Sequence, residues 1–167
     1  MYLQKRHRIL RSNPAIRSLV AETILTPNDF IAPLFIVEGE NIKEEISSMK
    51  NYYRHSVDLT VKEVKELWQM GIKSILLFVK SKDELKDNKG TEAINPNGLM
   101  QRSIRAIKDA CPEMVVMTDV ALDPYSSYGH DGIGEGNEIV NDATVEGLAK
   151  MSVGHAQEGQ GVEADRE

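Results

Sequence analysis

The chain has 167 residues, which suits a single domain, and its 41% hydrophobic content provides enough apolar material for a core. Charged residues make up 28%, the formal net charge is −6, and no run of 18 apolar residues occurs, so no transmembrane helix is expected. Residues 2–8 lack the apolar segment of a secretory signal, which makes a cytoplasmic protein the default expectation. The single cysteine, Cys111, can form neither an internal disulfide nor a zinc–thiolate cluster, as suits a reducing compartment.

Positive charge is concentrated at the N-terminus, where residues 1–20 carry five lysine or arginine side chains and no acidic one. One interpretation is an arm that contacts nucleic-acid phosphates. The other is an arm that docks on an acidic surface of its own body or of a neighbouring subunit. We favour the second, because Tyr2 is the only aromatic residue of this segment and the acidic remainder of the chain repels a polyanion. Neither nucleic acid nor membrane is therefore an expected partner.

Three short apolar segments predict buried β-strands, at residues 31–37, 72–79 and 114–120. In the first of them, Pro33 suggests an early or edge position in the sheet. Apolar residues at helical spacing predict three helices. The first opens with a capping box at Thr60 and stops at Gly71, the second carries Leu99, Ile104 and Ile107, and the third runs from Asn141 to about Gly159. This alternation predicts an α/β fold built from parallel βαβ units.

Three strands are few for a parallel α/β architecture. A closed (β/α)₈ barrel needs about 250 residues, and an open doubly wound sheet usually has about five strands or more. A fourth strand would be expected after Gly159, but residues 160–167 are too polar to be buried on both faces. We therefore expect the chain to form part of a larger fold.

Asp119 ends the third predicted strand, and ligands bind at the carboxyl ends of the strands in both parallel architectures. This position favours a catalytic or substrate-binding role, with hydrogen bonding to amides of the next loop as the alternative. The following loop adds Asp123, His130 and Asp131. Oxygen ligands of this kind suit magnesium or calcium better than zinc, although a solvated acidic loop would have the same composition.

Lys80 and Lys82 follow the second predicted strand, at the same end of the sheet as Asp119. A desolvated lysine in such a place can form a Schiff base with a ketone or an aldehyde. Residues 80–84 are hydrophilic throughout, so a solvated loop is the favoured interpretation. An unrelated small Schiff-base aldolase that uses Lys80 remains a weaker hypothesis.

Residues 117–132, together with Asn141 to Thr144, resemble the metal-loop signature of the porphobilinogen synthase family, also called 5-aminolevulinate dehydratase. Similar segments occur in the arm at residues 17–23, in the first strand region at 31–39, and in the second connection at 86–91. The resemblance covers roughly residues 5–157 in register.

The resemblance implies a (β/α)₈ TIM barrel, of which this chain would hold only part. Residues 1–30 would form an N-terminal arm. Residues 31–167 would form about three βα units of a partial barrel, truncated before its second half. Members of the family are usually homo-octamers in which the arms embrace neighbouring subunits, so self-association through the arm is expected.

The activity implied by the resemblance is that of a hydro-lyase, which condenses two molecules of 5-aminolevulinate into porphobilinogen in tetrapyrrole and heme biosynthesis. Asp119 matches the active-site aspartate of the family. Both Schiff-base lysines lie in the second half of the family's barrel, so the isolated chain is expected to be inactive. The alternatives are a non-catalytic assembly module or a truncated gene product.

The resemblance also carries expectations for the metal loop. Zinc-using members place three cysteines where this sequence has Ala121, Asp123 and Asp131. Zinc is therefore not expected in the 121–131 loop, and magnesium is, with potassium as the other possibility; Asp123 and Asp131 are the expected ligands. The remaining residues assigned to this loop or lid are Tyr125, Ser127, Tyr128 and His130. Tyr128 stands where many members have histidine, so proton transfer from this position is not expected.

Overall fold

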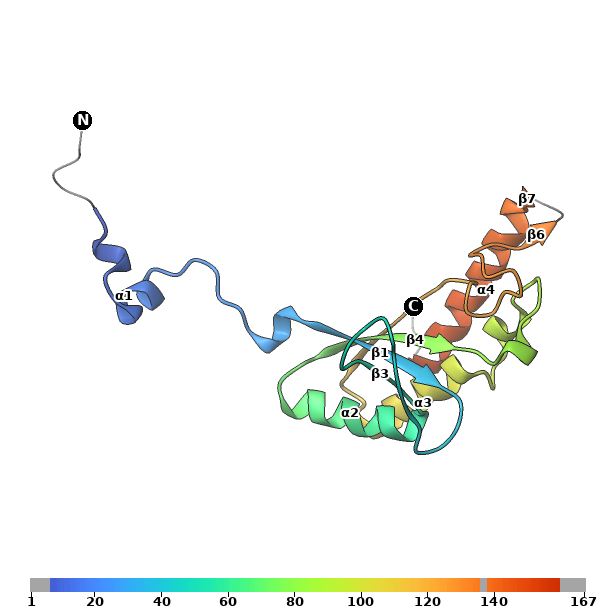
Figure 1. The fold of residues 1–167 in the computed structure, drawn as a ribbon, viewed down its shortest axis with the longest axis horizontal. Coiled ribbons are helices and arrows are strands. Elements are labelled where there is room, and N and C mark those ends of the chain that lie inside the picture. The colour runs from blue at the N-terminus through green and yellow to red at the C-terminus, as the bar shows by residue number, and fades with distance from the viewer. Residues whose placement is uncertain (1–6, 136–137, 160–167) are drawn as a thin grey trace, which may run out of the picture.

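The computed structural model describes residues 7–135 and 138–159. The expected loss of strand pattern in residues 160–167 lies outside these ranges. Within them, no helix is both long enough and apolar enough to cross a membrane. An N-terminal arm extends away from the body (Figure 1) and carries α1 (Pro14–Leu19) between the 3₁₀ turns Ile9–Arg11 and Pro27–Asp29. The boundary expected between residues 30 and 31 stays a prediction.

The body is built on a five-stranded, mainly parallel sheet in the order β2-β3-β1-β4-β5. Its strands are β1 (Ile31–Val37), β2 (Lys43–Glu45), β3 (Tyr53–His55), β4 (Ser74–Lys80) and β5 (Val115–Thr118). Strands β3, β1, β4 and β5 run parallel, whereas β2 pairs antiparallel with β3. The α/β class predicted from the sequence is thus confirmed, and the described residues form an open sheet. The β2–β3 pair was not predicted.

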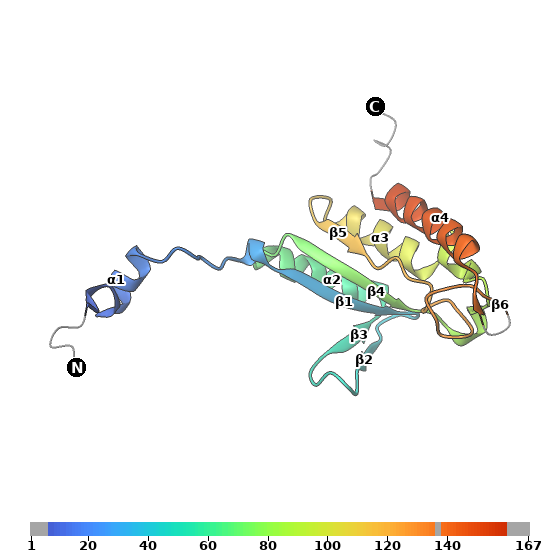
Figure 2. The same ribbon diagram turned by 90° about the horizontal axis from the view of Figure 1, so that it is seen from above.

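Three helices cover the sheet from one side. Helices α2 (Val57–Gln69) and α3 (Leu99–Ala110) lie side by side against one face (Figure 2), and α4 (Asn141–Gly159) packs on α3. Short 3₁₀ turns at Asp83–Leu85 and Thr91–Ile94 connect β4 to α3, and a small hairpin of β6 (Gly134–Glu135) and β7 (Glu138–Ile139) precedes α4.

Burial alternates along the strands, as a half-covered sheet requires. Leu34 and Ile36 of β1 and Ile75 and Leu77 of β4 are buried against the helices. The opposite face carries an aromatic group in which the rings of Phe35 and Phe78 stack with centroids 5.1 Å apart. In a closed (β/α)₈ barrel, the face opposite the helices is the packed interior.

Of the early or edge position expected from Pro33, the edge position is wrong. Strand β1 lies at the centre of the sheet, between β3 and β4. Strand β3, however, pairs with β1 only at Phe35 and Ile36. Tyr52 closes the gap by donating a side-chain hydrogen bond to the carbonyl of Pro33 (2.7 Å). Proline is tolerated here because no neighbouring strand needs its missing N–H.

The start of α2 also differs from the prediction of a capping box at Thr60. The helix begins one turn earlier, at Val57, after Ser56. The hydroxyl of Thr60 is buried and donates to the carbonyl of Ser56 (3.0 Å). The carboxylate of Asp58 lies in the first turn, where it accepts bonds from the Ser56 hydroxyl and the Asn41 amide. A carboxylate in the first helical turn complements the positive end of the helix dipole.

The turn from α2 into β4 follows the predicted stop at Gly71. This glycine has φ +94°, a conformation that side chains with a Cβ rarely adopt. The amide of Ile72 then donates to the carbonyl of Leu67 and closes the turn. Lys73 folds back over Trp68, with its ammonium nitrogen 3.5 Å from the ring centroid. This cation–π contact fixes the turn from outside the sheet.

Candidate active site at the carboxyl ends of the strands

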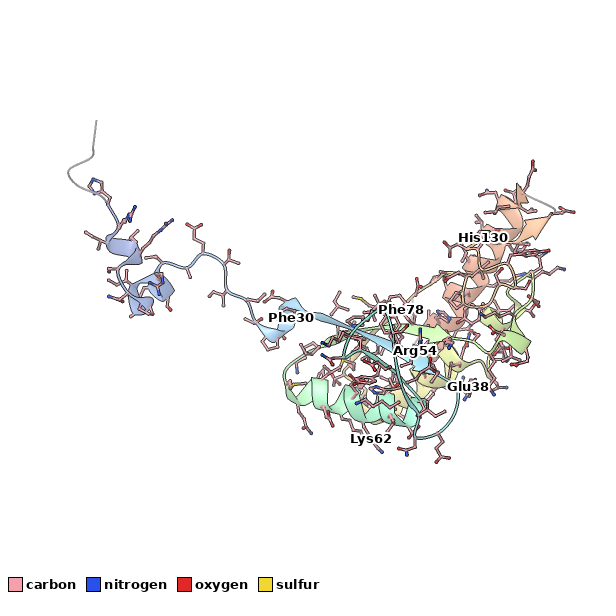
Figure 3. All side chains as sticks on the ribbon, in the orientation of Figure 1. Phe30, Glu38, Arg54, Lys62, Phe78 and His130 are labelled. Carbon is pink, nitrogen blue, oxygen red and sulfur yellow. The ribbon has the colours of Figure 1, made fainter. Side chains whose placement is uncertain are left out.

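A cavity of about 320 Å³ opens at the carboxyl ends of β1 and β4. Its wall combines aromatic side chains from the strands with polar and charged side chains from the loops. The lining includes Phe35, Arg54, Phe78, Lys80, Ser81, Lys86, Asp119, Asp123 and Tyr125. In Figure 3, Arg54 and Phe78 lie close to one another at this end of the sheet.

Asp119 is placed in the cavity by the pairing of β5 with β4. Its amide donates to the carbonyl of Leu77 at 3.2 Å, so the ladder continues one residue beyond the end of β5. Because side chains alternate along a strand, Asp119 faces the side of the sheet opposite the helices, as Phe78 does. The structure thus brings Asp119 and Lys80 to the same end of the sheet, as the sequence predicted.

The first half of the 121–132 loop is held firmly. The amide of Asp87 donates to the carbonyl of Tyr125 (3.2 Å), and the amide of Ser127 donates to the carbonyl of Asp87 (3.0 Å). Leu122 and Tyr125 are each 2% exposed and belong to the hydrophobic core. Tyr125 therefore differs from the other residues assigned to a lid, because its side chain is fixed in the core.

The second half of the loop is exposed. Tyr128 is 61% exposed, and Ser127 and His130 are also exposed. His130 lies at the periphery of the molecule (Figure 3). Beyond His130, the side chain of Asn88 holds the backbone of Gly134 by two hydrogen bonds: it donates one to the carbonyl and accepts one from the amide. A lid role for Ser127, Tyr128 and His130 stays a prediction.

Negative charge gathers around Asp123. Partial removal from water raises the pKa of this carboxyl, and repulsion by Asp131 and then by Asp119 raises it further. The structure therefore brings together the three acidic residues that the sequence singled out. Burial likewise raises the pKa of Tyr125, and the nearby carboxylates of Glu92, Asp119 and Asp123 add to that effect. The Tyr125 hydroxyl thus stays protonated in the physiological range.

Two hydroxyl groups at the cavity lack hydrogen-bond partners. The Tyr125 hydroxyl and the Ser81 Oγ are both buried and unpaired among the described residues, and both side chains line the cavity. Leaving a buried polar group unsatisfied costs about 1–3 kcal/mol, so such groups call for a functional explanation. Sequence reasoning missed Ser81, because it lies in a run of charged residues that indicates a wet loop. The structure buries it to 4% exposure.

The basic residues of the cavity are already paired. Arg54 binds Glu44 at 2.9 Å, and Lys80 lies 3.4 Å from the same carboxylate oxygen. Lys86 pairs with Asp83 at 2.8 Å. Sequence reasoning also missed Arg54, because it belongs to the unpredicted strand β3. The aromatic residues next to it, Tyr52 and Tyr53, were the available sign of a strand.

The acidic cluster offers oxygen ligands of the kind that a hydrated divalent ion prefers, and a magnesium site here stays a prediction. Among the residues that the structure describes, no three His, Cys, Asp or Glu side chains are arranged to hold a metal. Structural and catalytic zinc sites need three or four such ligands, whereas magnesium often binds through one or two carboxylates and keeps several waters. Asp123 and Asp131 could supply those two carboxylates, since their mutual repulsion shows that they lie close together.

Comparison with known proteins decides the family. The family model described as delta-aminolevulinic acid dehydratase matches residues 4–165. This chain belongs to the delta-aminolevulinic acid dehydratase family. A dehydratase of this name from Chlamydia pneumoniae is 42% identical over 162 residues, which cover 97% of this chain and 49% of that protein. The match to the Ruminiclostridium josui dehydratase is 45% identical and covers 93% of this chain and 75% of that protein.

A chloroplastic relative and a solved structure show the same relationship. The chloroplastic dehydratase of Glycine max is 47% identical over 165 residues and covers 96% of this chain. A crystal structure of the Toxoplasma gondii dehydratase, in complex with its reaction product porphobilinogen, matches this fold with a TM-score of 0.87 at 43% identity. That match covers 94% of this chain and 45% of the Toxoplasma chain. The chain thus spans about half the length of the Chlamydia and Toxoplasma dehydratases.

Proposed function

We propose that this chain supplies the Asp119 side of the active site of a delta-aminolevulinic acid dehydratase. The complete enzyme is a lyase that condenses two molecules of 5-aminolevulinate into porphobilinogen, on the route to heme. The observation that supports this most directly is the position of Asp119. It lies in a cavity at the carboxyl ends of parallel strands, on a fold that matches a product-bound dehydratase.

Asp119 would both bind substrate and carry out chemistry. Its carboxylate can accept a hydrogen bond from the ammonium group of 5-aminolevulinate and can take up a proton during ring formation. The aromatic rings of Phe35 and Phe78 form the apolar part of the same cavity and would shield the reacting atoms from water. The chain's own residues would thus position one substrate and move its proton.

The ketone of the substrate must be held by a lysine elsewhere in the complete barrel. A lysine becomes nucleophilic when its amine is desolvated. Lys80 is 56% exposed and ion-paired with Glu44, which is the opposite environment. We therefore infer that the 167-residue chain alone is inactive and that the lysines of the complete active site come from the second half of a TIM barrel.

Asp123 and Asp131 would hold the metal of the active site, and their chemistry favours magnesium, with potassium as the other candidate. The bound cation would supply neutralising charge next to Asp119. Without the cation, the carboxylates of Asp131 and Asp119 destabilise the ionised form of Asp123. This repulsion favours the binding of a hydrated cation between Asp123 and Asp131. Ser127, Tyr128 and His130 would close over this site as a lid.

The arm would mediate self-association of the chain and, in the complete enzyme, assembly of an octamer. Its apolar side chains are uncovered in the single chain, with Leu19 84% exposed and Ile9 76% exposed. A basic arm with exposed apolar residues fits an acidic neighbouring subunit. The cytoplasmic location expected from the sequence stays a prediction, since the Glycine max relative is chloroplastic.

A chimaera tests the proposed activity. Residues 1–157 of this chain would be joined, at the matching position, to the remainder of the Chlamydia pneumoniae dehydratase. We expect the chimaera to form porphobilinogen from 5-aminolevulinate, and Asp119→Asn to lower its kcat by about 100-fold or more. The control, Asp109→Asn, changes an exposed aspartate of α3 and should leave the rate unchanged. A folded chimaera that binds 5-aminolevulinate but forms no porphobilinogen would overturn the proposal.

A further inference from the structure

The unpaired hydroxyl of Tyr125 is the feature of the cavity that the proposed roles leave unexplained. Tyr125 is 2% exposed and lines the cavity. Its backbone is held in place by the hydrogen bond that the Asp87 amide donates to its carbonyl. Ser81 also lines the cavity, and its hydroxyl is likewise buried and unpaired among the described residues. Two preorganised hydroxyls at one cavity are more than packing requires, because a phenylalanine and an alanine would fill the same space without an unsatisfied group.

We propose that Tyr125 is a substrate-positioning residue whose hydroxyl oxygen accepts a hydrogen bond from a primary ammonium group, with Ser81 as an auxiliary acceptor. The inference rests on the proposed function, because it takes the amine of 5-aminolevulinate as the natural occupant. In that arrangement the Asp119 carboxylate attracts the ammonium group by its charge, and the Tyr125 hydroxyl orients it by a hydrogen bond.

The surroundings of Tyr125 select a cation. The carboxylates of Asp119 and Asp123 line the same cavity. The basic side chains at its wall are already paired, Arg54 and Lys80 with Glu44 and Lys86 with Asp83. A ligand carboxylate at this point would be repelled, whereas an ammonium group would be attracted. An ammonium also has three N–H donors, which suit the Asp119 carboxylate and the two hydroxyl oxygens.

A bare metal ion fits this position less well than an ammonium. The described residues include no arrangement of three acidic, histidine or cysteine side chains that could hold one. A neutral phenol is also a poor metal ligand, whereas its oxygen is an ordinary hydrogen-bond acceptor. A hydrogen-bonding organic cation is therefore the better occupant.

The test compares ligands that differ in the amine. Dissociation constants of the 167-residue chain would be measured by NMR titration, without divalent ions, for 5-aminolevulinate, for levulinate, which lacks the amine, and for aminoacetone, which lacks the carboxylate. We expect Tyr125→Phe to weaken binding of both amines by about tenfold and to leave levulinate binding unchanged. Ser81→Ala should weaken binding of the two amines by a smaller factor and should likewise leave levulinate binding unchanged.

Tyr53→Phe is the matched control, because Tyr53 lies on β3 outside the lining of the cavity and its hydroxyl should affect no ligand. Tyr125→Phe should also melt at the same temperature as the unaltered chain or higher, since it removes an unsatisfied hydroxyl. Equal losses for all three ligands would indicate a structural role and overturn the inference. Failure of the unaltered chain to bind either amine would overturn it as well. Binding of aminoacetone without 5-aminolevulinate would support it while contradicting the proposed function.

Discussion

Asp87 and Tyr125 are joined by a backbone hydrogen bond of 3.2 Å, although they belong to different loops. The side chain of Asp87 accepts bonds from the amides of Lys89 and Thr91, which shape its own turn. One residue thus folds the β4–α3 connection and holds the loop that forms the cavity. The position of Tyr125 therefore depends on a segment that is remote from it in sequence.

Gly90 lies where these two loops touch, and replacing it should separate them. It has φ +62°, and an added Cβ would lie 3.1 Å from the Cδ2 of Leu122. We expect Gly90→Ala to lower the free energy of unfolding by about 2 kcal/mol, about half from the left-handed backbone and half from the contact. Denaturant titration measures this loss.

Gly129→Ala is the control for Gly90→Ala. Gly129 has nearly the same backbone conformation, φ +67°, but an added Cβ would meet nothing within 4 Å. Gly129→Ala should lower the free energy of unfolding only by the backbone contribution, about 1 kcal/mol. Equal losses for the two variants would mean that the contact between Gly90 and Leu122 does not hold the loops together.

The sequence predicted what depends on local pattern. The apolar runs gave β1, β4 and β5 to within a few residues, and helical spacing gave α2, α3 and α4. The β2–β3 pair was missed, because β2 consists of Lys43, Glu44 and Glu45, all exposed, and has no apolar side to reveal it. The start of α2 was misplaced, because Asp58 is held by Asn41, a contact between residues distant in sequence.

The candidate site was predictable in part for the same reason. Asp119 and Asp123 could be found from a strand end and its loop. Arg54 could not be found, since it reaches the cavity only through the missed strand β3. The burial of Ser81 depends on how the two loops pack together, and no local pattern of charge reveals it.

Asp123→Asn should stabilise the chain near neutral pH. The pKa of this carboxyl is raised in the folded state, so the folded chain binds the proton more tightly than the unfolded one. The resulting penalty is present above the raised pKa and disappears as the pH falls below the ordinary value near 3.8. The gain from the substitution should therefore vanish in acid, as urea titrations across the pH range would reveal.

Asp131→Asn provides the matched variant, because it removes the charge that repels Asp123 while keeping the Asp123 carboxyl. It should give a gain of the same sign near neutral pH. A loss of stability in both variants at neutral pH would contradict the repulsion between the two carboxyls.

His155 should make the chain less stable in mild acid. It is 5% exposed, its Nδ1 lies 3.0 Å from the Thr118 hydroxyl, and burial lowers its pKa. Lys108 and Glu113 are the charged residues lining the hollow beside it. Because the unfolded chain takes up this proton more readily, stability should fall as the pH drops through the ordinary histidine value near 6.5.

His155→Gln should flatten this pH dependence, measured as the change in urea midpoint between about pH 7.5 and about pH 5. His130→Gln, at an exposed position, should leave it intact. An unchanged pH dependence in His155→Gln would assign the acid sensitivity to another group.

The isolated chain should self-associate. Among the described residues, the outer edge of β5 has no strand partner, and Val115 and Met117 are 52% and 40% exposed. The edge of β1, by contrast, is covered in its second half by the β2–β3 pair. Unpaired edges and apolar patches promote association. A monodisperse monomer that melts cooperatively, in light scattering and calorimetry, would contradict this expectation.

The contact between Lys73 and Trp68 also determines what intrinsic fluorescence can report. Trp68 is the single tryptophan of the chain, and it packs partly buried on α2 while the cavity is lined by residues from other elements. Its emission therefore follows the closing of the α2–β4 turn during folding. A change of emission on adding 5-aminolevulinate would mean that occupancy of the cavity shifts the helices on the far side of the sheet.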